Sequence, residues 1–151
     1  MISFCAETAV DTLPYLKECF PLHWEELALN KDKVPLDPQY DLYLEREQRG
    51  ELMLVVGREN GEIVAYFVGF VAPGMHYKTC LTLIMDIFYV MPKHRGKMTG
   101  IRLFKFVQQE AKNRGVDRMF VGTKCHKDAG WLFEKLGYEE VERTYSMWLG
   151  E

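Results

Sequence analysis

The feature of this sequence that most constrains its fold is a junction between an apolar strand-like segment and a long amphipathic helix. Residues 81–90 are rich in β-branched and aromatic side chains and are followed by Pro92, a pattern that predicts a strand. A helix is predicted to begin near Thr99, because apolar residues then recur at helical spacing up to Gly115. Residues 94–100 therefore lead into a helix N-terminus, where the first N–H groups lack helical acceptors and the helix dipole favours an anion. We expect a ligand that carries phosphate to bind at this junction.

Shorter patterns on both sides of the junction predict a mixed sheet with helices on its faces. Before it, we expect a strand at 2–4, a helix over 12–18 that Asp11 caps and Pro21 terminates, and a helical turn at 23–29. A helix that starts at Asp37-Pro38 and stops at Gly50 follows, and then strands at 52–58 and 63–71 joined by an Asn60-Gly61 turn. After it, we expect a strand at 118–123, a helix at 128–136 and a strand-like ending at 138–149. The fold class is therefore α/β of the α+β type, in the order strand, helix, helix, three strands, helix, strand, helix, strand.

The composition predicts one globular domain over residues 1–151. A chain of 151 residues can bury roughly two-thirds of its unfolded surface, and 48% hydrophobic residues argue against extended disorder. No linker or internal repeat divides the sequence. The net charge of −3 gives no overall attraction to nucleic acid or to an anionic membrane, and only residues 93–97 form a basic patch.

The sequence shows no signal-peptide motif, no membrane-spanning stretch and no metal-binding motif. The N-terminus lacks the basic and apolar regions of a signal peptide, and no apolar stretch reaches bilayer length, so we expect a cytoplasmic protein with no membrane partner. The four cysteines and four histidines are scattered without ligand spacing, so we expect reduced cysteines and no metal.

Two segments, 87–100 and 129–138, resemble the GNAT family of acetyl-CoA-dependent N-acetyltransferases, in particular its small single-domain bacterial and phage members. The first segment carries the family's [Q/R]xxGx[G/A] loop after a Val-x-Pro strand end, and the second carries its Ala-x-x-x-Tyr-x-x-x-Gly-Phe helix end. The matching residues are Arg95 and Gly100 in the first motif and Ala129, Gly137 and, conservatively, Tyr138 in the second. The resemblance spans nearly the whole chain and implies a GNAT-like, mostly antiparallel central sheet flanked by helices.

The resemblance implies acetyl-CoA as the acyl-donor cosubstrate. Backbone N–H groups of the loop would hold the pyrophosphate, with Arg95 and Lys97 adding charge nearby. The edge of residues 88–90 would pair with the pantetheine amides, and an N–H near Val90 or Met91 would polarise the thioester carbonyl. The implied cofactor-binding residues are Phe88, Tyr89, Val90, Arg95, Gly96, Lys97, Met98, Thr99, Gly100, Ile101 and His126, the last of which stands where an Asn usually contacts the cofactor.

Two residues depart from the family pattern. Met98 stands where the family usually has Gly, which removes a permissive backbone position but leaves an amide donor. Phe133 occupies the position of a Tyr that often protonates the departing thiolate, and a phenyl ring cannot donate a proton. Tyr138, Tyr145 or a water would have to supply that proton.

Asp86 is the candidate general base. It lies within an apolar strand, near where many family members place an acidic base, and burial there would raise its pKa towards a useful range, so that it could act directly or through a water. The alternative is a structural carboxylate bonded to a neighbouring strand or helix cap.

The segments that normally shape the acceptor pocket in this family contain Trp24, Glu25 and Tyr77. The two aromatic rings could form an apolar wall, and Glu25 or its neighbour Glu26 could attract the positive charge of an amine. The equally weighted alternative is that Trp24 only anchors its helix and the glutamates form a solvated face.

These expectations favour an N-acetyltransferase that moves acetyl from acetyl-CoA to a primary amine, in a small molecule or at a protein lysine or N-terminus, by direct attack in a ternary complex. The first alternative is a non-catalytic CoA-binding or partner-binding protein on the same fold, motivated by Met98 and Phe133. The second is a modifier of nucleic-acid bases, against which the overall acidity argues. An exposed C-terminal strand would allow a homodimer.

Overall fold

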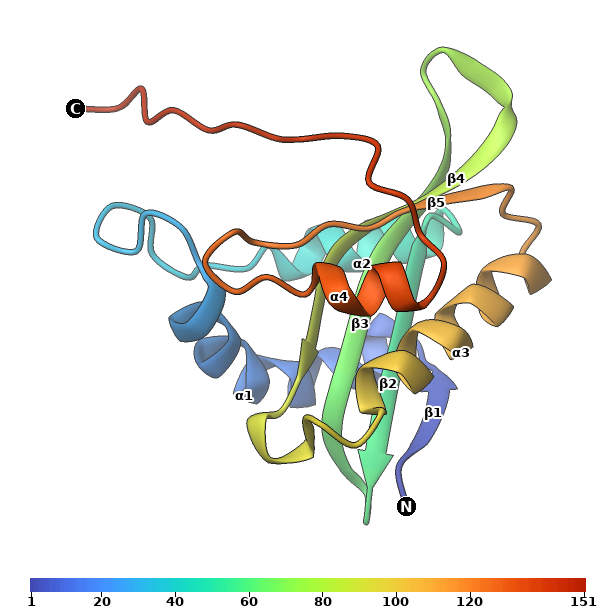
Figure 1. Ribbon diagram of the computed structural model, residues 1–151, viewed down its shortest axis with the longest axis horizontal. Helices are drawn as coiled ribbons and strands as arrows, with labels where there is room; N and C mark the ends of the chain where they lie inside the picture. The colour runs from blue at the N-terminus through green and yellow to red at the C-terminus, as the bar shows by residue number, and fades with distance from the viewer.

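The computed structural model describes all residues from 1 to 151 and shows a five-stranded sheet with helices on both faces (Figure 1). The strands are β1 (Ser3–Ala6), β2 (Leu52–Glu59), β3 (Glu62–Gly74), β4 (Tyr77–Val90) and β5 (Arg118–Phe120), and they lie in this order across the sheet. The first four strands are antiparallel, and β5 pairs with β4 in parallel. The mostly antiparallel mixed sheet predicted from the sequence is confirmed.

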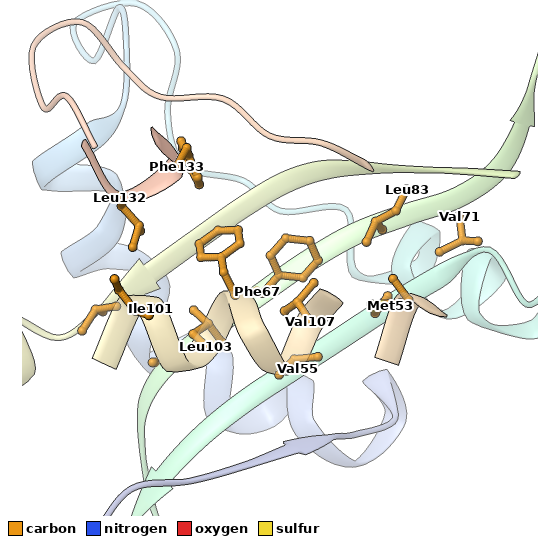
Figure 2. Packing of buried hydrophobic residues seen from close by; sticks show 14 residues of the cluster. Met53, Val55, Phe67, Val71, Leu83, Ile101, Leu103, Val107, Leu132 and Phe133 are labelled. Atoms are coloured by element: carbon orange, nitrogen blue, oxygen red, sulfur yellow. The ribbon is translucent and has the colours of Figure 1, made fainter. Parts of the chain in front are cut away.

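The helices sort into two layers because side chains alternate across each strand. The helical segments are α1 (Ala9–Leu27), α2 (Tyr40–Gln48), the short 3-10 turn η1 (Pro92–His94), α3 (Thr99–Asn113) and α4 (Gly130–Lys135). Leu54 and Val56 of β2 pack with α1, whereas Met53 and Val55 pack with α3 and α4 on the other face. Figure 2 shows the second layer, in which Phe67 of β3 belongs to the same cluster as residues of α3 and α4.

The predicted turn between β2 and β3 and the predicted start of helix α3 are confirmed. Asn60 and Gly61 have φ angles of 52° and 83°, and they join β2 to β3 in the predicted antiparallel pair. The helix predicted to begin near Thr99 begins there and ends before Gly115.

The prediction that Pro21 ends the first helix was wrong. α1 continues to Leu27 with Pro21 inside it, so the helical turn expected at 23–29 is the end of the same helix. A proline inside a helix costs a backbone hydrogen bond, but Leu16 and Phe20, which precede Pro21, are buried against the sheet, and Leu27, which follows it, packs on the same cluster. Tertiary packing therefore keeps the helix continuous.

The prediction of a C-terminal strand at 138–149 was also wrong. β5 stops at Phe120, so its outer edge offers only a short row of backbone groups for a further strand. Residues 138–151 form no helix or strand, Tyr145 is 88% exposed, and the segment runs away from the sheet (Figure 1). The expectation of a homodimer rested on this strand and stays a prediction.

β4 and β5 separate early, and this separation positions the site. They pair only from Thr82 to Ile84 of β4, although β4 continues to Val90. On its other side β4 stays paired with β3, with a register shift that leaves Asp86 as an extra, bulged residue. From residue 85 onwards, the edge of β4 that faces β5 therefore has no strand partner. No helix of the protein is both long enough and apolar enough to cross a lipid bilayer.

Candidate active site

A cleft of about 620 Å³ opens where β4 and β5 separate. Its walls come from the end of β4, the end of α1, the loop before α3 and the segment that leads into α4. The structure brings ten of the eleven predicted cofactor residues to this cleft: Phe88, Tyr89, Val90, Arg95, Gly96, Met98, Thr99, Gly100, Ile101 and His126. Lys97, the eleventh, is exposed and does not line it.

The loop before α3 presents a row of free backbone donors. No protein group accepts a hydrogen bond from the backbone N–H of any residue from 96 to 101. Gly96 (φ 77°) and Met98 (φ 60°) both take left-handed conformations, which turn the chain into the helix. Such a row at a helix N-terminus is a ready-made site for phosphate oxygens.

The free edge of β4 supplies a second set of donors. The N–H of Met91 donates to the carbonyl oxygen of Val64 at 2.9 Å and is therefore not free to meet a ligand. Because N–H directions alternate along an antiparallel strand, the N–H groups of Phe88 and Val90 point to the opposite side, towards the cleft. Of the two donors predicted for the thioester carbonyl, only Val90 is available.

An ion pair closes the end of the cleft. Both terminal nitrogens of Arg95 bind the carboxylate of Glu26, at 2.6 and 2.7 Å, and its Nε donates to the carbonyl oxygen of Val90 at 2.9 Å. The Tyr89 hydroxyl donates to the same carboxylate at 2.6 Å. The sequence predicted that Arg95 adds positive charge beside a pyrophosphate, but its charge is paired with Glu26 instead.

This network shifts the pKa values of its members. The hydrogen bonds from Arg95 lower the pKa of Glu26 to about 2, against the opposing effect of burial. Burial, followed by the hydrogen bond to Glu26, raises the pKa of Tyr89 to about 12. His23 stacks on Tyr89 with ring centroids 4.7 Å apart, its Nδ1 lies 2.6 Å from the Tyr66 hydroxyl, and burial lowers its pKa to about 4. His23 is therefore neutral near pH 7.

Asp86 lies at the bulge of β4, outside the cleft lining. The residue is exposed as a whole, but surrounding protein partly desolvates its carboxylate and raises its pKa, while the charge of Arg46 acts in the other direction. The structural alternative required a hydrogen bond to a neighbouring strand or cap, and the carboxylate accepts none from the protein. Asp86 as a base stays a prediction.

The structure does not bring the three predicted acceptor residues together. Tyr77 begins β4 and Phe88 is its first residue to line the cleft, so about 11 residues, or roughly 36 Å of strand, separate Tyr77 from the cleft. Trp24 is half-buried on α1 but does not line the cleft, and exposed Glu25 pairs with Lys31 at 3.6 Å. The glutamate that reaches the cleft is its neighbour, Glu26.

The cleft lining includes neither of the two tyrosines considered for leaving-group protonation, Tyr138 and Tyr145, and it does not include Phe133. Phe133 is 7% exposed and packs edge-on against Phe88 and Phe104. The Tyr138 hydroxyl accepts a hydrogen bond from Gln108 at 2.9 Å and donates to the sulfur of Met119 at 3.3 Å. The hydroxyl of Tyr138 is thus engaged inside the protein, which favours water as the proton source.

Several cleft residues were not among the site residues predicted from the sequence, although Glu26 was named as an alternative to Glu25 and Ala129 as a motif residue. They are Glu26, Leu27, Lys127, Asp128, Ala129, Trp131, Leu132 and Lys135. Most of them belong to the segment before α4 and to α4 itself, whose predicted helical spacing already placed Trp131 and Lys135 one turn apart. No group of three or more His, Cys, Asp or Glu side chains is arranged to hold a metal ion.

Residues 14–138 match the sequence model of the acetyltransferase (GNAT) family. The chain belongs to the GNAT acetyltransferase family. No curated protein sequence matches it. The resemblance seen in the loop and helix motifs is confirmed, and members of this family bind acetyl-CoA.

Solved structures of GNAT acetyltransferases share the fold over nearly the full chain. An aminoglycoside acetyltransferase from an uncultured soil metagenomic sample is 14% identical, with 99% of each chain covered and a TM-score of 0.77. A glucosamine-6-phosphate N-acetyltransferase from Arabidopsis thaliana is 15% identical, again with 99% of each chain covered, and has a TM-score of 0.74. A predicted acetyltransferase from Clostridium acetobutylicum, solved with acetyl-CoA, is 14% identical, with 99% of this chain and 97% of that chain covered and a TM-score of 0.71.

The left-handed conformation of Met98 predicts a stabilising substitution. This conformation costs a non-glycine residue about 1–2 kcal/mol, and glycine loses about 0.5–1 kcal/mol more chain entropy on folding. Met98→Gly should therefore raise the free energy of unfolding by about 0.5–1 kcal/mol, measured by urea denaturation. Lys97→Gly is the matched control and should lower it, because Lys97 has no positive φ. A loss of stability in Met98→Gly would contradict the loop conformation.

The ion pair of Glu26 predicts a pH-dependent contribution to stability. The pKa of Glu26 is lowered from 4.5 to about 2 in the folded protein, so its contribution is present above pH 4.5 and is lost as the pH falls through 2. Glu26→Gln should lower the free energy of unfolding at pH 7 by about 1–3 kcal/mol and flatten its decline over that range. Urea denaturation at a series of pH values measures both effects. Glu25→Gln should leave the wild-type curve unchanged, and an equal effect of both variants would refute the ion pair.

Proposed function

We propose that this protein transfers an acetyl group from acetyl-CoA to a primary amine by direct attack in a ternary complex. The observation that carries the proposal is the cleft in which six consecutive free N–H groups meet an unpaired strand edge. The free N–H groups suit the oxygens of a pyrophosphate, and the unpaired strand edge suits a ligand arm that contains amides. Membership of the GNAT family supports the same cosubstrate.

Acetyl-CoA supplies an acetyl group activated as a thioester. The N–H groups of residues 96–101 would hold its pyrophosphate without relying on Arg95, whose charge is paired with Glu26. The N–H groups of Phe88 and Val90, on the free edge of β4, would align its amide-containing arm, while the Val90 carbonyl oxygen stays bonded to Arg95. The N–H of Val90 would then donate to the thioester carbonyl oxygen as negative charge develops on it.

The acceptor is a primary amine, in a small molecule or in a protein. Its neutral nitrogen would form a bond to the acetyl carbon while the carbon–sulfur bond breaks. Asp86 would take the proton that the nitrogen loses, directly or through a water, and the desolvation that raises its pKa suits it to this role. The departing sulfur would take a proton from water, since Phe133 has no donor and the Tyr138 hydroxyl is engaged elsewhere.

One observation favours a second candidate function, a CoA-binding protein that does not catalyse transfer. No tyrosine hydroxyl lines the cleft at the α4 side, because Phe133 is buried and Tyr138 bonds to Gln108. Tight binding of acetyl-CoA without release of free thiol in the presence of any amine would favour this candidate.

The proposal is tested by the rate of thiol release from acetyl-CoA across a panel of amines, followed by Asp86→Asn with the best acceptor. Loss of a general base should lower the rate by about 10²- to 10⁴-fold. Because the base acts when deprotonated, the wild-type rate should fall as the pH drops through the raised pKa of Asp86, and the variant should lack this decline.

Asp41→Asn, an exposed carboxylate on the neighbouring helix α2, is the matched control and should keep the wild-type rate and pH profile. An unchanged rate and profile in Asp86→Asn would remove Asp86 from the chemistry. Absence of turnover with every amine, together with binding of acetyl-CoA, would replace the proposal with the second candidate.

A further inference from the structure

Asp86 lies on the face of the sheet that carries α1 and α2. Met85, the residue before it, packs on the opposite face with the cluster of α3 and α4, and successive side chains of a strand alternate between faces. Burial, followed by the charge of Asp86, raises the pKa of Tyr43 on α2 to about 12, which places the carboxylate on the α2 side. Ile84 shares this face by the same alternation and is 53% exposed, so the helices leave this part of the sheet uncovered.

Arg46 is a cation without a protein partner on the same face. It lies in the last turn of α2, and its guanidinium carbon stands 4.2 Å from the centre of the Phe70 ring. Its Nε is shielded from solvent but donates no hydrogen bond, and the ion pair that forms on α2 joins Arg49 to Glu45 instead. A guanidinium stacked on a ring keeps the donors at its edge for a planar anion such as a carboxylate.

The charges of Arg46 and Asp86 are neighbours that do not meet. Phe70, which lies under Arg46, is the cross-strand partner of Ile84, and Asp86 lies two residues further along β4. Burial raises the pKa of Asp86 and the charge of Arg46 opposes this rise, but the two groups form no ion pair within 4.0 Å. A ligand that carries an amine and a carboxylate complements this arrangement, because each of its charges meets the opposite one.

The order of these groups along β4 matches the order that a reacting acceptor needs. Phe88, the first residue of β4 to line the cleft, follows Asp86 by two residues, or roughly 7 Å of strand. Arg46 stacks level with Ile84, which lies on the other side of Asp86 from the cleft. An amine held at Asp86 is therefore near the free edge of β4, while Arg46 contacts a part of the acceptor that does not react.

We propose that the acceptor is a free amino acid, whose carboxylate pairs with Arg46 while its amine lies at Asp86. This inference rests on the proposed function and narrows its acceptor to a small molecule, because a lysine side chain or the N-terminus of a protein has no carboxylate beside its amine. The amine nitrogen takes the acetyl group, its proton goes to Asp86, and the products are an N-acetyl amino acid and CoA. Exposed Ile84 would contact the amino acid's side chain, which favours an apolar one.

The test measures kcat/KM by thiol release for the common free amino acids, and then for the α-carboxamide and the decarboxylated amine of the best of them, for example L-leucine, L-leucinamide and 3-methylbutylamine. Arg46→Gln should lower kcat/KM for the amino acid by about 10- to 100-fold, mainly through KM, and leave the two analogues unchanged. The comparison of variant with wild type cancels differences in the intrinsic reactivity of the amines.

Arg46→Lys keeps the charge without the planar fork and should retain part of the preference for the carboxylate. Arg49→Gln, three residues along on α2 and 62% exposed, is the matched control and should keep all three wild-type values. Circular dichroism of each variant separates a loss of binding from a loss of folding.

Two results would overturn the inference and leave the proposed function standing. The first is turnover of amines that lack a carboxylate but of no free amino acid. The second is an equal effect of Arg46→Gln on the amino acid, its carboxamide and its decarboxylated amine. Absence of turnover with every amine would instead overturn the proposed function, and this inference with it.

Discussion

The ion pair between Glu26 and Arg95 is the interaction on which the site depends. Glu26 lies in the last turn of α1, Arg95 begins the loop before α3, and the Arg95 guanidinium also donates to the carbonyl oxygen of Val90 at the end of β4. The end of α1 is thus fixed to the connection between β4 and α3, 69 residues away in sequence, by one pair of charged groups. The pair is bidentate, and the Glu26 side chain is largely shielded from solvent, so the pair fixes the relative position of the two segments as well as adding stability.

Apart from this ion pair, the geometry of the cleft is set by how the strands of the sheet pair. β5 pairs with β4 over a few residues only, so the end of β4 keeps a free edge, and that edge faces the loop. The left-handed turn at Met98 then directs the loop N–H groups into the cleft mouth, at a conformational cost that glycine would avoid. The site is therefore made largely of backbone groups, and its specificity comes from the side chains around them.

The sequence predicted what local patterns determine. The Asn60-Gly61 turn, the helix start at Thr99 and the cleft-lining residues of the loop before α3 each depend on a few neighbouring residues. It could not predict features set by distant contacts. Pro21 stays inside a helix because the sheet buries Phe20, and the strand-like C-terminal segment lacks a sheet edge long enough to pair with. The sequence offered Glu26 only as an alternative to Glu25 in the acceptor pocket, and its ion pair with Arg95 was not predicted because the two residues lie 69 positions apart.

The most direct test of the account is a titration of the isotope-labelled protein with CoA, followed by the amide resonances in ¹H–¹⁵N NMR spectra. New hydrogen bonds to the free donors should shift the amide signals of residues 96–101 and of Val90 most strongly, while the amide of Met91, already bonded to Val64, should move less. Shifts confined to other parts of the chain, or no shifts at all, would contradict the assignment of this cleft to coenzyme A.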